Sequence, residues 1–98
     1  MTALALVIAP EAQQDLRDVY LYSKRTWGER QAGVYLDHIK SCFWLLTTQP
    51  NAGTLRPELG HEVQSFVVKR HVVFYRRQPN QLQVVRVLHG RQDPKLPS

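Results

Sequence analysis

The chain has one cysteine, Cys42, among its 98 residues. A single thiol cannot close an internal disulfide or supply a cluster of thiolate ligands, which excludes a disulfide-stapled scaffold and a zinc ribbon. No apolar run approaches the roughly 18 residues that span a bilayer, and the apolar start has neither a basic residue before it nor a separate cleavage region. We therefore expect a cytoplasmic protein without a membrane partner, stabilised by packing.

The sequence also lacks the usual signatures of a small-molecule enzyme. It contains no phosphate loop, dinucleotide fingerprint or serine elbow. The histidines His38, His61, His71 and His89 show no metal-ligand spacing, so we expect neither a metal nor another cofactor. Cys42 has no nearby activating group and is interpreted as a plain buried thiol. A two-layer domain of this size rarely encloses a deep substrate pocket.

What the chain does contain is a globular composition and an uneven charge. Hydrophobic residues make up 43% and charged residues 21%, which indicates a single packed domain over residues 1–98. The net charge is +5, and residues 1–50 hold five basic and five acidic side chains, against eight and three in residues 51–98. The basic second half favours a polyanionic or acidic partner, either nucleic acid or an acidic protein segment.

Hydrophobic spacing predicts a strand and two helices in the first half. Residues 3–8 are a short apolar run, expected to be a strand buried on both faces. Apolar residues at helical spacing predict helices over residues 10–27 and 30–48, with Gly28 ending the first. Because the joint is so short, these helices should be antiparallel neighbours.

The period changes to two in the second half. Residues 50–61 carry prolines and glycines and are expected to be a loop, and residues 91–98 are expected to be a tail. Three runs rich in β-branched or aromatic residues predict an antiparallel meander at residues 62–69, 71–78 and 81–89. The predicted class is α+β in the order β-α-α-β-β-β, with the helical hairpin on one face of a small, mainly antiparallel sheet and the other face open for function.

Individual side chains are assigned by their helical phase. Trp27 and Phe43 fall on the inner stripes and are expected in the core, whereas Asp15 and Asp18 are assigned to the solvated face of the first helix. Gly33, inside the second helix, suggests a close approach to the first helix, although a neutral surface glycine is an equal alternative.

Alternation assigns the faces of the last strand. Val85 and Val87 should face the helices, so that Val84 and Arg86 point from the open face or its rim. His89 follows at the strand end, where we expect a ring packed and bonded to the backbone. A role as a general acid or base stays an alternative.

Five passages in a fixed order resemble the RelE/ParE toxin superfamily, in its ParE branch. They are A-P-E-A-Q-Q-D-L at 9–16, Y-x-x-x-x-W-G-E-R-Q-A at 22–32, L-x-x-x-P-N-A-G-x-x-R-P-E-L at 46–59, H-V-V-F-Y-R at 71–76 and V-V-R-V-L-H-G-R-Q-D at 84–93. The resemblance implies the toxin of a type II toxin-antitoxin pair, silenced in a hetero-oligomer by an acidic ParD-like antitoxin and serving plasmid or genome maintenance. The ParE branch implies DNA gyrase as the target, and the RelE branch implies mRNA on the ribosome.

The residues that RNA cleavage requires distinguish the RelE branch from the ParE branch. RNA cleavage needs a proton acceptor, a cationic cradle for the phosphate and an acid for the leaving oxygen. The RelE pattern implies lysines before and within the second strand and a late tyrosine, but the loop 50–61 has no lysine and no aromatic residue follows Tyr75. We therefore expect a gyrase poison rather than an enzyme. A ribonuclease, as the alternative, would use Arg76, Arg86 and His89, with Glu58 or Glu62 in support.

The basic residues then divide by expected partner. A second alternative, a basic nucleic-acid-binding module or a homologue without toxicity, also stays open, and direct nucleic-acid binding is possible without being required. The predicted contacts are Arg86, Arg91 and Lys95 for the target, and Arg17, Arg70, Arg76 and Arg77 for the antitoxin.

Overall fold

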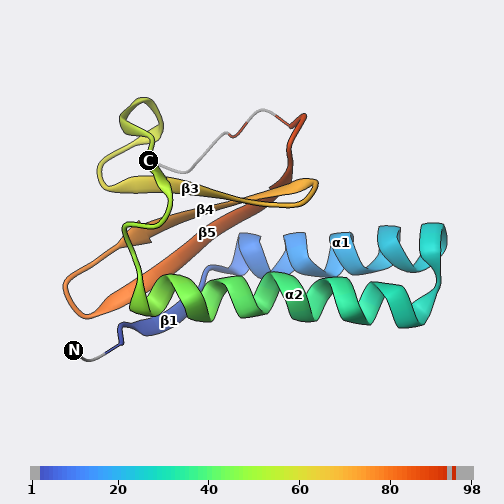
Figure 1. Ribbon diagram of the computed structural model, residues 1–98. Helices are drawn as coiled ribbons and strands as arrows, with labels where there is room; N and C mark the ends of the chain where they lie inside the picture. Colours follow the sequence, from blue (N-terminus) through green and yellow to red (C-terminus); the bar gives the residue numbers. More distant parts are fainter. Residues whose placement is uncertain (1–2, 93, 95–98) are drawn as a thin grey trace.

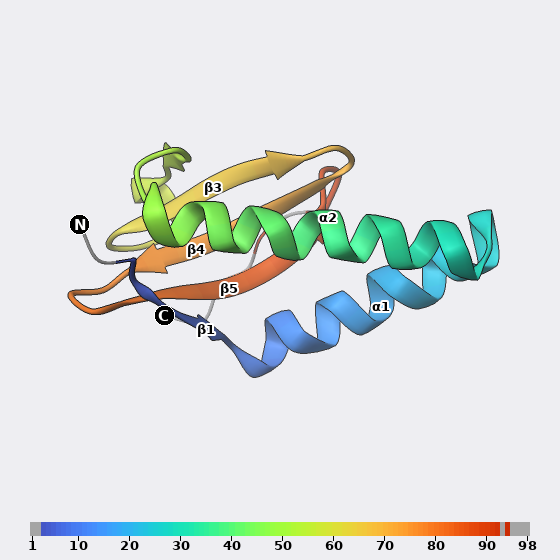
Figure 2. The same cartoon turned by 60° about the horizontal axis from the view of Figure 1, so that its bottom comes forward.

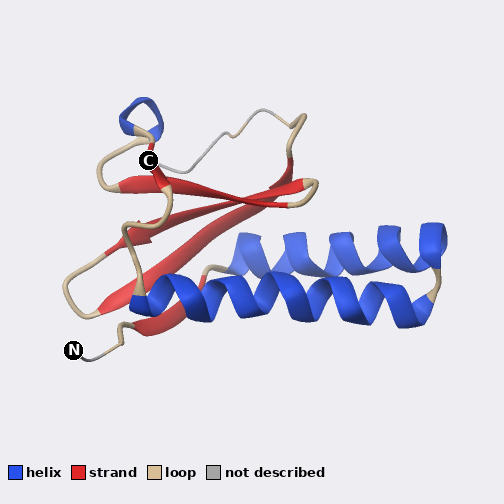
Figure 3. Ribbon diagram, in the orientation of Figure 1, coloured by secondary structure: helices blue, strands red, loops and turns tan. Residues whose placement is uncertain are grey.

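The computed structural model describes residues 3–92 and 94, which form two long helices and a five-stranded sheet (Figure 1). The predicted α+β class and order of elements are confirmed, and one further short strand follows the helices (Figure 3). The elements are β1 (Ala5–Ile8), α1 (Pro10–Trp27), α2 (Glu29–Thr48), β2 (Thr54–Leu55), the 3-10 helix η1 (Pro57–Leu59), β3 (Val63–Val68), β4 (His71–Arg77) and β5 (Gln81–His89).

The sheet has the strand order β1-β5-β4-β3-β2. β1 runs parallel to β5, with Ile8 opposite Val84, and the other neighbouring strands are antiparallel. The prediction that the first strand is buried on both faces is wrong, because β1 is an edge strand whose residues alternate between exposed and half-buried. Edge and central strands draw on the same apolar residue types, so the run alone did not distinguish them.

A single residue, Gly28, joins the two helices. Its φ of 93° lies in the left-handed region that favours glycine, and its N–H donates to the carbonyl oxygen of Lys24 at 2.9 Å, which closes α1. Pro10 begins α1, where its fixed φ suits the first turn. Figures 1 and 2 show the helices side by side over one face of the sheet, with their Gly28 end projecting past the β3–β4 turn.

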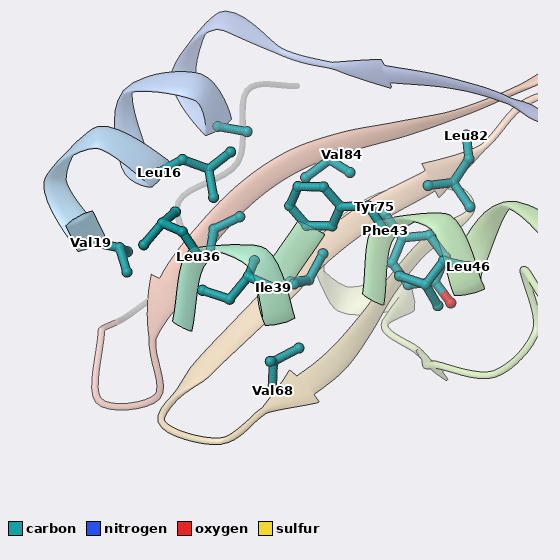
Figure 4. Close-up of a cluster of buried hydrophobic side chains, with 13 residues drawn as sticks. Leu16, Val19, Leu36, Ile39, Phe43, Leu46, Val68, Tyr75, Leu82 and Val84 are labelled. Carbon is teal, nitrogen blue, oxygen red and sulfur yellow. The ribbon is translucent and has the colours of Figure 1, made fainter. Parts of the chain in front are cut away.

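The core lies between this helical hairpin and the sheet (Figure 4). Phe43 and Ile39 of α2 and Tyr75 of β4 are fully buried, so the prediction for Phe43 is confirmed. The prediction that Trp27 is a core residue is wrong, since Trp27 is 45% exposed. The end of α1 that carries Trp27 projects past the sheet, so no sheet strand of residues 3–92 covers it as a second layer (Figure 1).

Two glycines show opposite surroundings. The hydroxyl of Tyr75 accepts the N–H of Gly53 at 3.0 Å and lies 2.7 Å from the carbonyl oxygen of Pro50 and 2.6 Å from Oε1 of Gln64. A Cβ on Gly53 would lie 2.5 Å from that hydroxyl oxygen, so the loop before β2 needs glycine there. A Cβ on Gly33 would have no atom within 4 Å, so the predicted close approach to α1 is wrong.

A β-bulge changes the alternation in β5. Two consecutive residues of β4 face Val84 and Arg86, so Val85 is an extra residue between them. Val84 and Val87 both belong to the core cluster as a result. The predicted inward direction of Val87 is confirmed, and the assignment of Val84 to the open face is wrong.

Candidate functional site

The sheet face away from the helices is apolar at its centre. Phe74 of β4 and Leu88 of β5 are 3% and 5% exposed, and the guanidinium carbon of Arg56 lies 5.9 Å from the centre of the Phe74 ring. The predicted open face is thus closed to solvent at its centre. The candidate functional groups therefore lie at its ends and rims.

Arg86 is held in an ion pair with Asp15 of α1. Nε and Nη2 of Arg86 donate to the two carboxylate oxygens at 2.8 and 2.9 Å, and the N–H of Val87 donates to the same carboxylate at 2.9 Å. The hydrogen bonds that Arg86 donates to Asp15 raise the pKa of Arg86. Asp15 is 8% exposed, so its assignment to a solvated face is wrong. Its position three residues after the buried Ala12 is the signal that placed it on the inner stripe.

The ion pair closes an unpaired edge of the sheet. β1 ends opposite Val84, so no strand of the described residues pairs with the rest of β5 on that side, and Asp15 accepts the N–H of Val87 there. The bidentate geometry satisfies both carboxylate oxygens. Contact between Arg86 and a target stays a prediction. The Arg86 side chain already joins β5 to α1 through Asp15.

The other predicted contact residues are spread over the surface. Arg17 is exposed on α1, where it donates to the side-chain oxygen of Gln14 at 3.0 Å. Arg70 is exposed at the β3–β4 turn, and Arg91 is exposed after β5. Lys95 lies outside the described residues. The residues predicted to contact the antitoxin therefore do not form a single cluster on the described part of the chain.

Arg76 and Arg77 lie at the far end of β4, beside an open hollow of about 930 Å³. We call it the arginine hollow; it is lined by residues 59–62 and 76–79. His61 and Glu62 form a weak pair on its rim, with Nε2 3.7 Å from Oε1. Two guanidinium groups in an open hollow suit a carboxylate or phosphate of a large partner rather than an enclosed substrate.

The residues of the ribonuclease alternative do not converge. Arg76 faces Gln83 across the β4–β5 ladder, and His89 lies six residues further along β5. Six residues of strand separate their positions by about 20 Å. Glu58 pairs with Arg56 at 2.8 Å in the loop, and this hydrogen bond lowers its pKa.

His89 belongs to a second cavity, which sequence reasoning missed. Its Nδ1 accepts the N–H of Arg91 at 3.2 Å, and its ring lies 5.5 Å from that of His71, which confirms the packed, backbone-bonded ring that the sequence predicts. Tyr35 places its hydroxyl 2.6 Å from Nδ1 of His71. Burial lowers the pKa of His71 and raises that of Tyr35.

We call this second cavity the turn pocket, because the β3–β4 turn forms one of its walls. It has a volume of about 290 Å³. Its lining comes from both helices, the turn and the end of β5, so no local motif indicated it. The lining residues are Tyr22, Trp27, Gln31, Tyr35, Lys69, Arg70, His71 and His89.

A third hollow runs along the two helices. Its volume is about 700 Å³, and we call it the helix groove. Its floor is apolar, and the charged side chains on its rim include Arg17, one of the predicted antitoxin contacts. The lining residues are Ile8, Gln13, Leu16, Arg17, Tyr20, Leu21, Gly33, Leu36, Asp37 and Lys40.

Within residues 3–92 and 94, no group of three or more His, Cys, Asp or Glu side chains is arranged to hold a metal ion. Cys42 is half-buried, and burial raises the pKa of its thiol. Neither α1 nor α2, the long helices of the described part of the chain, is long and apolar enough to cross a membrane.

Comparison with known proteins gives one consistent family. The sequence model described as "ParE toxin of type II toxin-antitoxin system, parDE" matches residues 6–94. Toxin ParE1 of Caulobacter vibrioides is 29% identical over 82 residues, which are 84% of each chain.

Solved structures share the fold. A chain of the chromosomal ParDE system from P. aeruginosa superposes with a TM-score of 0.77 at 19% identity, covering 89% of this chain and 96% of that one. A chain of the toxin-antitoxin complex RelBE2 from Mycobacterium tuberculosis gives 0.62 at 20% identity, covering 90% and 99%. At these identities the likeness concerns the fold alone.

Proposed function

Because the chain belongs to the ParE toxin family of type II toxin-antitoxin systems, we propose that it is a toxin neutralised by an acidic ParD-like antitoxin and that its target is DNA gyrase. Its place of action is the cytoplasm, where it contributes to plasmid or genome maintenance. The family match over residues 6–94 is the observation that carries the toxin assignment. The choice of gyrase over ribosomal mRNA rests on a separate, geometric argument.

The residues that a ribonuclease would need for phosphate binding and proton transfer lie apart in the structure. Arg76 and His89 lie at opposite ends of the β4–β5 ladder, and Arg86 is engaged by Asp15. A ribonuclease site needs its cradle and its proton donor around one phosphate. A poison that acts by binding needs only affinity and position. The arrangement supports a binding toxin, with Arg91 and Arg86 at the end of β5 as its predicted target contacts.

Two purified assays test the target. The toxin is added to gyrase supercoiling reactions and, separately, to ribosomes translating a defined message. We expect loss of supercoiling and an intact message, and we expect the His89→Gln variant to behave as wild type. Cleaved message with unaffected supercoiling would replace gyrase by the ribonuclease alternative, and toxicity lost in His89→Gln would assign that ring a chemical role.

Matched charge reversals test the contact surface. Arg91→Glu, at the end of β5, should weaken gyrase inhibition, while Arg25→Glu, on the exposed surface of α1, should not. Equal effects of the two changes would mean that only net charge matters. Arg86→Glu is unsuitable for this test, because it would place two carboxylates together at Asp15 and destabilise the fold.

For the antitoxin, we propose docking along the helix groove. The apolar floor provides the area that a helical segment buries, and Arg17 on its rim attracts an acidic chain. Arg70, Arg76 and Arg77 extend the positive surface toward the two ends of β4.

Association kinetics test this docking. The association rate should fall between about 50 and 500 mM salt, and Arg17→Glu should slow association more than Arg25→Glu on the same helix. A salt-independent rate would remove the electrostatic part of the proposal. Growth arrest on expression without antitoxin tests toxicity itself, and its absence would favour the non-toxic alternative.

A further inference from the structure

The turn pocket takes no part in the proposed contacts with gyrase, and its walls come from distant parts of the chain. Its lining residues come from the Gly28 end of the two helices, from the β3–β4 turn with the start of β4, and from the end of β5. A volume of about 290 Å³ is at the lower end of the range for small-ligand cavities. The pocket therefore has room for one compact chemical unit rather than a folded segment.

The polar groups of the pocket select for an anion. Lys69 and Arg70 supply two positive charges, and none of the eight lining residues is acidic. Both cations are placed by aromatic rings: Nζ of Lys69 lies 6.0 Å from the centre of the Tyr35 ring, and the guanidinium carbon of Arg70 lies 5.3 Å from that of Trp27. Cation–π contacts of this kind reduce the freedom of the two side chains before any ligand arrives.

The backbone of the turn is strained at one of these cations. Lys69 has a φ of 54°, in the left-handed region where glycine is the favoured residue. A side chain in that region costs about 1 kcal/mol or more. Lys69 and Arg70 are the two-residue loop between the paired residues Val68 and His71, and hairpin loops of this length use a positive φ, so the turn itself accounts for this conformation.

The pocket also presents flat aromatic surface to solvent. Trp27 and Tyr22 are 45% and 55% exposed, and their rings meet edge to face with centroids 6.2 Å apart. Exposed rings beside cations are the features by which proteins hold unpaired nucleotides, with the base stacked and the phosphate paired. An acidic peptide would use the cations but would leave the aromatic surface without a stacking partner.

We propose that the turn pocket binds one unpaired nucleotide of a single-stranded nucleic acid, with its base against Trp27 and Tyr22 and its phosphate between Lys69 and Arg70. This site is a property of the isolated chain, so the proposal stands or falls independently of gyrase as the target.

Binding of a labelled single-stranded oligothymidylate, followed by fluorescence anisotropy, is the direct test. Arg70→Gln and Trp27→Leu should each weaken binding about tenfold, the effect of losing one stacked or paired nucleotide. The control is Arg25→Gln, which removes the same charge from the exposed surface of α1, outside the lining of the pocket, and should leave the affinity within about twofold. Equal weakening by Arg70→Gln and Arg25→Gln would overturn the proposal, because it would show attraction to net charge alone.

Tryptophan fluorescence locates the bound base. The chain has two tryptophans, and Trp44→Phe leaves Trp27 as the only reporter. Trp44 is 61% exposed on α2, so this change should leave the fold intact. Quenching of Trp27 by the oligonucleotide is expected, and binding without quenching would contradict the assignment of the base.

Lys69→Gly separates binding from folding. It removes the charge and the strain together, so the melting temperature should stay the same or rise while the affinity falls several-fold. Affinity equal to wild type would remove Lys69 from the site.

The occupant is tested by competition. The matched duplex should bind more weakly than the single strand. A glutamate-rich peptide can pair with Arg70 but has no base to stack, so it should leave the fluorescence of Trp27 unchanged. Displacement together with Trp27 quenching by the peptide would assign the pocket to an acidic protein segment instead. Equal affinity for duplex and single strand would exclude an unpaired nucleotide, and a mononucleotide that matches the oligonucleotide in affinity would replace the strand by a free nucleotide.

Discussion

The two halves of the helical hairpin have the same amphipathic pattern and different surroundings. Over the sheet, Ala12 and Phe43 are fully buried, whereas at the Gly28 end Tyr22 and Trp27 are 55% and 45% exposed. Trp27 continues the inner stripe of α1, so its exposure reflects the missing second layer and not its phase. A helical stripe is buried only as far as the sheet reaches, and beyond that point it is surface available for binding.

The largest expected difference in stability between the two halves comes from truncating one large aromatic residue in each. Phe43→Ala should cost roughly 3 to 5 kcal/mol, because it leaves a cavity in the core. Trp27→Ala should cost about 1 kcal/mol or less, since much of that ring already contacts water. Urea melts give both values, and similar losses would mean that the projecting end is packed as tightly as the covered half.

On the half of the hairpin that the sheet covers, the Asp15–Arg86 ion pair should contribute measurably to stability. Asp15→Asn should cost about 2 to 4 kcal/mol, because Arg86 and the N–H of Val87 lose their charged acceptor. Asp18→Asn, on the exposed side of the same helix, should stay within about 0.5 kcal/mol of wild type. Equal stability of the two variants in urea would show that the ion pair contributes nothing to folding.

Substituting alanine for a helix glycine should give a smaller effect of opposite sign. Gly33→Ala should stabilise the chain by roughly 0.5 to 1 kcal/mol, because the new methyl group meets no atom and the backbone loses freedom only in the unfolded state. Gly53→Ala is the contrasting variant, expected to destabilise through its clash with the Tyr75 hydroxyl. Thermal melts compare them, and a destabilised Gly33→Ala would restore the close approach to α1.

The smallest expected effect is at His71 of β4, whose ring centre lies 5.5 Å from that of Tyr35 on α2. Burial lowers its pKa below 6.5, with His89 adding to the shift, so the unfolded chain binds a proton more readily than the folded one. Stability should therefore be complete above about pH 6.5 and fall as the pH drops from there toward the lowered folded value. His71→Gln should flatten this dependence in melts from about pH 7.5 to pH 5. His61→Gln, at a 93% exposed side chain, should keep the wild-type slope, and a wild-type slope in His71→Gln would assign the dependence to other groups.

The fold was predictable because its signals are local. The helical stripes, the Gly28 stop and the period-two runs each lie within one element, and the helices match the prediction to within a residue at each end. The Asp15–Arg86 pair joins residues 71 apart, and only the buried phase of Asp15 hinted at it. The bulge at Val85 and the turn pocket arise from strand pairing and from the meeting of four chain segments, which no periodicity reports.

The pairing of β1 with β5 has a consequence for the order of folding. β1 is made well before its partner residues, Gln81 to Val84, because the two helices and three other strands lie between them in the sequence. The helices can form earlier from local contacts, while this edge of the sheet has to wait for a loop spanning most of the chain to close. A nascent chain stalled before β5 therefore lacks both the partner of β1 and the strand that Asp15 braces. The target contacts proposed at the end of β5 can form only after β5 is made, so a chain stalled before β5 should be inert.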